Sequence, residues 1–349
     1  MKRFLLATAL AVAAAVPLAA AAAPPPIAQA DQPIPVIASF SLLGDLVSQV
    51  GGEHVQVHSL VGPDQDAHVF QPRPSDAARL ARAKLVVING LGFEGWIGRL
   101  TDSVGYRGPV VVATEGIAAQ EMAAGHVHDH GHDHGDHKDH GHTDHGHEDH
   151  DHNKDHDHGD DKSHARGHRG AGNVADPHAW HDPRNVMVYV RNIAAALGAA
   201  DPQNATRYTD NARVYIARLE ALDQWAQTQM NAIAPQDRKV IIAHESMQYF
   251  GHRYGVQFLA PQGMSTMAEP AAGEVAALIA QIRREKVKAL FLESVTNPAL
   301  LQQIASEAGV KVQGRLYSDA LSGPAGPAPS YLQMFRYNVE RLRAAMQAD

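Results

Sequence analysis

The chain has 349 residues and no cysteine, and its 38 acidic and 30 basic residues give a net charge of −8 at neutral pH. The whole of this excess lies in one histidine-rich tract, residues 126–168, because the remainder has as many basic as acidic residues. The composition therefore excludes a disulfide framework, and nothing outside the tract suggests a nucleic-acid partner. A chain of this length can bury a core that is stable without cross-links.

The first thirty residues have the pattern of a secretory signal peptide. Two basic residues at positions 2–3 precede an apolar run over residues 4–23, and Ala28 and Ala30 supply the small residues that a signal peptidase reads. A membrane anchor is the alternative, but the run is interrupted by proline and is rich in weakly apolar alanine. We therefore predict a signal peptide over residues 1–30 and a soluble periplasmic protein, since no cysteine is present for lipid attachment.

The chain outside the tract alternates between short β-branched runs and longer helical stretches. This alternation predicts an α/β fold with two lobes, each a mostly parallel sheet covered by helices. The expected strands are residues 34–40, 55–60, 85–89 and 110–113 in the first half, and 239–243, 256–259, 289–292 and 310–316 in the second.

The tract at residues 126–168 holds sixteen of the 23 histidines of the chain and almost no apolar residue. Such a segment cannot build a core, and we predict a disordered loop. Neutral imidazole binds borderline divalent metal ions well, so the loop is expected to act as an auxiliary, low-affinity metal collector. The alternative is a solvated loop without a role in metal binding.

A long helix is expected after the tract, over residues 201–234. Asp201 and Pro202 form its predicted start, apolar residues recur at spacings of four and three from Tyr208 to Ala226, and Pro235 ends it. About thirty residues correspond to about 45 Å, which is long enough to span both lobes. An ordinary surface helix is the alternative. The spanning version divides the mature chain into an N-terminal lobe at 31–200, a linking helix at 201–234 and a C-terminal lobe at 235–349.

Four residues are candidates for a metal site because each follows an expected strand or lies in a turn-rich segment: His68, His178, His244 and Asp319. Ligands of open α/β sheets gather beyond the carboxyl ends of the strands, so these loops are expected to converge in the cleft between the lobes. Three imidazoles and one carboxylate suit tetrahedral Zn(II). Manganese would favour more oxygen ligands and a higher coordination number.

Other polar residues near these positions are expected to support the site. His181 lies three residues after His178 and could be a ligand by spacing, but we expect it to orient a neighbouring group. Glu245 and Glu293 are possible acceptors for the second N–H of a ligating histidine. The remaining histidines outside the tract are expected to be surface or packing residues: His54, His58 and His252.

Several segments occur in an order that resembles a known family. They are SFSLLGDLVSQVGG, LVGPDQDAHVFQPRPSDAARLARAKLVVINGLGFEGW, DPHAWHDPRNV, KVIIAHESMQYFGHRYGV and the Ser318-Asp319 turn. Together they resemble the metal-binding proteins of bacterial zinc and manganese ABC importers, over nearly all of the mature chain except the tract. Matched motif to motif, the resemblance implies four ligands: His68, His178, His244 and Asp319. Manganese-binding members often have Glu at the third position, so His244 favours zinc.

The resemblance implies a monomeric binding protein, not an enzyme. It would hold one tight Zn(II) between two lobes pinned by a long helix, with weak additional zinc in the histidine-rich loop. The protein would deliver the metal to a membrane permease that is driven by a cytoplasmic ATPase. A periplasmic metallochaperone that loads the protein with zinc is a possible further partner. Some members carry a cysteine pair that this chain lacks, and others use water in place of Asp319.

Three alternatives remain open from the sequence. One is a manganese-binding importer protein, and another is an exported adhesin or metal buffer that uses the same fold without a transporter. The third is a zinc hydrolase with Glu245 or Glu293 as general base, although no compact catalytic signature such as HExxH is present.

Overall fold

The computed structural model describes residues 32–122, 174–263, 266 and 269–347. The predicted signal peptide at 1–30 and the histidine-rich tract at 126–168 lie outside the described residues. The described residues from Pro33 onward form one compact unit. Of the helices that the structure describes, none is both long and apolar enough to cross a membrane.

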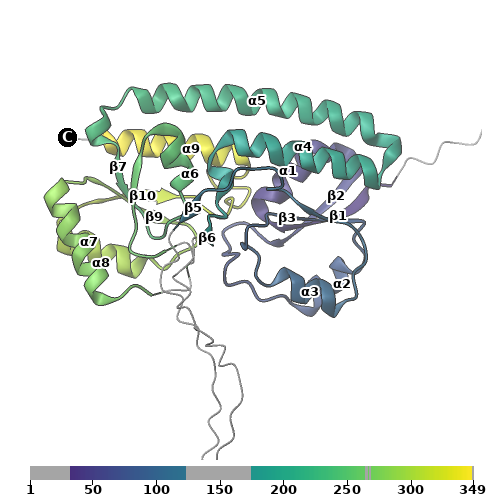
Figure 1. The fold of residues 1–349 in the computed structure, drawn as a ribbon, viewed down its shortest axis with the longest axis horizontal. Coiled ribbons are helices and arrows are strands. Elements are labelled where there is room, and N and C mark those ends of the chain that lie inside the picture. Colours follow the sequence, from purple (N-terminus) through teal and green to yellow (C-terminus); the bar gives the residue numbers. More distant parts are fainter. Residues whose placement is uncertain (1–31, 123–173, 264–265, 267–268, 348–349) are drawn as a thin grey trace, which may run out of the picture. The chain divides into compact units, whose positions relative to one another are not determined.

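The first lobe contains a parallel sheet with strand order β2-β1-β3-β4. Figure 1 shows helices α1 and α4 on one face of this sheet and helices α2 and α3 on the other. Strands covered on both faces need apolar residues in succession, which explains runs such as LVVI in β3. The elements are β1 (Ile34–Phe40), β2 (Val55–Val61), β3 (Leu85–Ile88), β4 (Val110–Val112), α1 (Ser41–Gly51), α2 (Pro74–Leu80), α3 (Ile97–Ser103) and α4 (Pro183–Ala200).

The second lobe repeats this plan with the strand order β10-β9-β7-β8, again parallel. In each sheet the first strand is central, with the second strand on one side and the third on the other. In α/β proteins with this kind of strand order, ligands bind beyond the carboxyl ends of the strands, where the strand order changes direction. The elements are β7 (Lys239–Ile241), β8 (Gln257–Leu259), β9 (Ala289–Glu293), β10 (Val312–Leu316), α6 (Gln248–Tyr254), α7 (Ala272–Glu285), α8 (Pro298–Ala308) and α9 (Tyr331–Met346).

All eight predicted strands are present, with ends that differ by two residues at most, and the prediction of two parallel sheets is confirmed. The sequence analysis missed a short antiparallel pair, β5 (Glu121–Met122) and β6 (Val174–Ala175). Each of these strands has only two residues, which is too short for any periodicity to show. The pair flanks the histidine-rich tract in the sequence and leads into the segment that carries His178.

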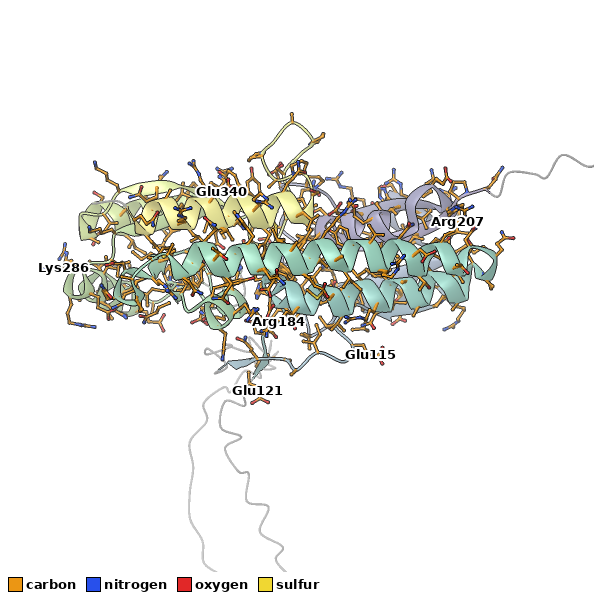
Figure 2. All side chains as sticks on the ribbon, turned by 90° about the horizontal axis from the view of Figure 1, so that it is seen from above. Glu115, Glu121, Arg184, Arg207, Lys286 and Glu340 are labelled. Atoms are coloured by element: carbon orange, nitrogen blue, oxygen red, sulfur yellow. The ribbon has the colours of Figure 1, made fainter. Side chains whose placement is uncertain are left out.

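The predicted long helix is α5 (Ala205–Asn231), which has 27 residues and a length of about 40 Å. It packs against α1 and α4 of the first lobe and against α6 and α9 of the second, so the spanning helix is confirmed. Figure 2 shows it running past α4, marked by Arg184, and α9, marked by Glu340. It begins later than predicted because a 3-10 turn (Pro202–Asn204) precedes it.

The Asp223 side chain in α5 is hydrogen-bonded to two residues of α6, and these bonds predict how the stability of the fold depends on pH. It is buried and accepts hydrogen bonds from Arg253 Nε at 2.9 Å, Arg253 Nη2 at 2.6 Å and the Tyr254 hydroxyl at 2.7 Å. Burial alone raises the pKa of the Asp223 carboxyl, but these hydrogen bonds and the Arg253 charge outweigh burial and lower the pKa below its ordinary value of 3.8. The carboxylate therefore stabilises the fold above about pH 4, and this contribution is lost as pH falls through the lowered pKa.

We expect Asp223→Asn to lower the free energy of unfolding of the metal-free protein by about 1–3 kcal/mol at pH 7. The difference from the wild type should shrink below about pH 4, as measured by urea unfolding across pH. The matched control is Asp210→Asn in the same helix. Asp210 is exposed and forms a single surface ion pair, with Arg213 at 3.6 Å, so we expect no measurable change in the free energy of unfolding. A deficit for the Asp223 variant that is equal at pH 3 and pH 7 would contradict this account.

Candidate metal site

The four predicted ligands come from four loops and meet at one point. His68 lies between β2 and α2, His178 follows β6, His244 follows β7, and Asp319 follows β10. One ligand atom from each residue lies within 4.8 Å of the ligand atoms of the other three. His178, His244 and Asp319 are completely buried, and His68 is partly buried. The first lobe thus contributes two of these histidines, and the second contributes the third histidine and the aspartate.

The Asp319 carboxylate is central to this cluster. Its Oδ2 atom lies 3.0 Å from His244 Nε2 and 3.5 Å from His68 Nε2, and its Oδ1 atom lies 3.8 Å from His178 Nε2. These three nitrogens and two oxygens are buried and make no well-formed hydrogen bond within the described residues. Buried polar atoms almost always have partners, so five convergent atoms without one are the arrangement expected of a metal-binding site.

Two buried carboxylates orient two of the histidines. Asp176 Oδ1 lies 2.8 Å from His178 Nδ1, and Glu293 Oε2 lies 2.9 Å from His244 Nδ1. Each pair leaves Nε2 facing the cluster, as in metal sites where a carboxylate fixes the ligating tautomer. Glu293 is also held in place, because it accepts hydrogen bonds from the backbone N–H of His244 and from the Ser246 hydroxyl.

Sequence reasoning named Glu293 as a possible partner of a ligating histidine but missed Asp176. A signal was present: Asp176 stands two residues before His178, and its side chain also accepts the backbone N–H of His178 at 2.9 Å. An aspartate commonly bonds to the backbone two residues further along the chain. The DPH sequence is thus a turn that places the carboxylate beside the imidazole ring.

The carboxylates and His244 in this cluster shift one another's pKa values. Burial raises the pKa of Asp319, but the charges of His244 and His178 outweigh burial and hold that pKa well below its usual value. Burial likewise raises the pKa of Glu293, and its interaction with His244 lowers the pKa overall. Burial lowers the pKa of His244, but Glu293 and Asp319 raise it well above its usual value. The ionised Asp319 and Glu293 carboxylates therefore favour a positively charged His244 in the metal-free site, and a metal ion would have to displace a proton from that ring.

His181 is completely buried next to this cluster but is not one of its four members. Neither of its ring nitrogens has a hydrogen-bond partner within the described residues. Burial lowers its pKa to about 4, with partial compensation from the Asp319 charge, so the ring is neutral at pH 7. The preceding residue, Trp180, forms a wall of the site: its ring centroid is 5.2 Å from that of His178, and its Nε1 donates to the carbonyl oxygen of Ser318.

Comparison with known proteins identifies the family. The model of the family described as ZnuA, zinc-uptake complex component A, periplasmic, matches residues 36–345. The chain is 26% identical to the manganese-binding lipoprotein MntA of Bacillus subtilis, over 91% of each chain. It is 25% identical to the iron-binding protein YfeA of Yersinia pestis, over 88% of this chain and 84% of that one. The fold is similar to that of the periplasmic zinc-binding protein TroA of Treponema pallidum, with a TM-score of 0.73, 21% identity and coverage of 90% and 100% of the two chains.

These relatives bear on the alternatives that the sequence left open. They are named as metal-binding proteins, and another relative is named as a substrate-binding lipoprotein of an ABC transporter. The family therefore supports a binding protein and not the zinc hydrolase that the sequence left open. The named metals are manganese and iron as well as zinc, so the family alone does not fix the metal. The chain belongs to the ZnuA family of periplasmic metal-binding proteins, the solute-binding components of ABC metal importers.

Proposed function

We propose that this protein binds one Zn(II) ion tightly in the periplasm and delivers it to an ABC importer, with zinc as its cargo. The observation that carries the proposal is the buried set of three imidazole nitrogens and one carboxylate, whose ligand atoms lie within 4.8 Å of one another. In a tetrahedral zinc site, ligand bonds near 2.0–2.1 Å place neighbouring ligand atoms about 3.3 Å apart. The separations of 3.0, 3.5 and 3.8 Å between Asp319 oxygens and the three Nε2 atoms bracket that value.

The choice of zinc over manganese rests on the donor atoms. His68, His178 and His244 offer nitrogen, and one aspartate offers oxygen, a set that suits zinc better than the harder manganese ion. Named relatives at 25–26% identity bind manganese or iron, so a manganese importer protein is the alternative. The residues His68, His178, His244 and Asp319 are the ligands in either case.

The proposed partners are a membrane permease and its ATPase. The signal-peptide pattern at residues 1–30 supports export to the periplasm. A strain that lacks this protein should grow poorly in medium depleted of zinc by a chelator, and added zinc should restore growth while added manganese should not. Restoration by manganese alone would favour the alternative, and normal growth without the protein in zinc-depleted medium would contradict a role in zinc uptake.

We also propose that the histidine-rich loop collects zinc with low affinity. Equilibrium dialysis of the full mature chain should then show several weak zinc sites in addition to a tight one. Deletion of residues 127–167 should remove the weak sites and leave the tight one. Binding to the weak sites should fall below about pH 6, because imidazole must be neutral to bind metal. Unchanged multi-site stoichiometry after the deletion would contradict the collector role.

A further inference from the structure

The segment that carries Asp319 leaves the second lobe at Tyr317. Asn338 of α9 holds Tyr317 on both sides: its side-chain oxygen accepts the Tyr317 N–H at 3.0 Å, and its amide donates to the Tyr317 carbonyl at 2.7 Å. The next bond crosses to the first lobe, where Trp180 Nε1 donates to the carbonyl of Ser318 at 2.8 Å. Asp319 therefore stands where the chain changes its partners from the second lobe to the first.

Two first-lobe residues then form hydrogen bonds with the backbone N–H and carbonyl oxygen of Leu321. The Ser41 hydroxyl accepts the Leu321 N–H at 3.0 Å, and the Asp64 N–H donates to the Leu321 carbonyl at 2.9 Å. The Asp64 carboxylate also accepts the N–H of Gly323 at 3.0 Å. We call these three hydrogen bonds, made by Ser41 and Asp64, the Ser41–Asp64 clasp. It holds the Asp319 segment two residues beyond the ligand itself.

The backbone of Asp64 indicates that its position is enforced. Its φ angle is +55°, in the left-handed region that residues other than glycine rarely adopt. Such a conformation persists where surrounding bonds fix it, and here the clasp supplies them. Asp64 is four residues before His68, so a single loop carries one metal ligand and the clasp that holds another.

We propose that Ser41 and Asp64 are positioning residues for metal binding, which fix Asp319 against His68 and His178 although Asp319 belongs to the second lobe. This inference rests on the proposed function and adds a control on metal release. A ligand set binds tightly only when its members are held close to the productive geometry. With Asp319 fastened to the first lobe, three of the four ligands form one preorganised group, and loosening the clasp frees the carboxylate to leave the metal.

The test compares two variants of Asp64 in the tract-deleted mature protein loaded with zinc alone. Asp64→Gly removes the carboxylate while it keeps the left-handed backbone accessible, and Asp64→Asn keeps an acceptor oxygen for the Gly323 N–H. We expect zinc dissociation into excess chelator to be about tenfold faster for the glycine variant, with little change in the association rate. The asparagine variant should recover most of the loss.

A double-mutant cycle separates positioning from general destabilisation. If Asp64 acts through Asp319, Asp64→Gly should have almost no further effect on zinc dissociation in an Asp319→Ala background. The matched control is Asp45→Asn. The Asp45 carboxylate also accepts a backbone N–H of the chain that follows Asp319, that of Tyr331 at 2.8 Å, but this bond lies well beyond the Ser41–Asp64 clasp. This control should release zinc at the wild-type rate.

Two results would overturn the inference. One is a wild-type dissociation rate for Asp64→Gly, and the other is a full effect of that change in the Asp319→Ala background. The proposed function fails separately, if the unsubstituted protein holds no tight zinc.

Discussion

Replacing His178 or His244 with alanine should weaken tight zinc binding by about a hundredfold. Structural zinc sites with four ligands have binding free energies of about 10–16 kcal/mol, so each ligand accounts on average for about 2.5–4 kcal/mol, and 1.4 kcal/mol corresponds to a factor of ten. Both side chains are completely buried, and their Nε2 atoms face Asp319 at 3.8 and 3.0 Å. The affinity is measured by competition with a chromophoric chelator in the protein without residues 127–167.

The control for this prediction is His54→Ala. His54 lies outside the ligand cluster, where its ring packs edge-on against Tyr208, and its loss should leave zinc affinity unchanged. His68→Ala should behave like the two other ligand variants. Equal losses at His54 and at the three ligand positions would show that the ligand assignment is wrong.

Replacing Glu293 with glutamine should lower zinc affinity by about 10–100-fold, although Glu293 is not itself a ligand. The carboxylate lies 2.9 Å from His244 Nδ1, where its charge raises the basicity of the ring and fixes Nε2 as the free nitrogen. Glutamine has nearly the same shape and keeps an acceptor oxygen, so the variant removes charge with little change in packing. Asp176→Asn should have an effect of similar size through His178, since that pair is separated by 2.8 Å.

A matched control for the Glu293 variant is Glu285→Gln. Glu285 also pairs with a cation, Lys239 at 2.8 Å, but this pair lies at the opposite end of β7 from His244. Its loss should leave zinc affinity unchanged. Wild-type affinity of the Glu293 variant would mean that the carboxylate stabilises the fold only and does not tune the metal ligand.

Much of the fold could be predicted from the sequence because its signals are local. The central strands β1, β3 and β9 are largely buried, so they appear as apolar runs between polar turns. The long helix shows its buried side every three or four residues, from Tyr208 to Ala226. Its start was misplaced because the Asp201 side chain accepts hydrogen bonds from Asn204 and Tyr208, which favours a separate 3-10 turn there.

The support around the site could not be predicted in the same way. The four candidate ligands stood out because they follow strands and match family motifs. The Ser41 hydroxyl, however, meets the Leu321 N–H across 280 positions of the sequence, and no periodicity or spacing reports such a pairing. His181 has a spacing that would suit a ligand, yet it lies outside the cluster. Spacing along the chain indicates which side chains can meet, and the packing of the loops decides which of them do.

The central claim is a single tight zinc site formed by His68, His178, His244 and Asp319, and native mass spectrometry tests it most directly. The mature protein without residues 127–167 is exposed to limiting zinc in competition with manganese. We predict one tightly held zinc ion per chain and no manganese retained in its place. A preference for manganese, or the absence of any tightly held metal in this protein, would contradict the claim.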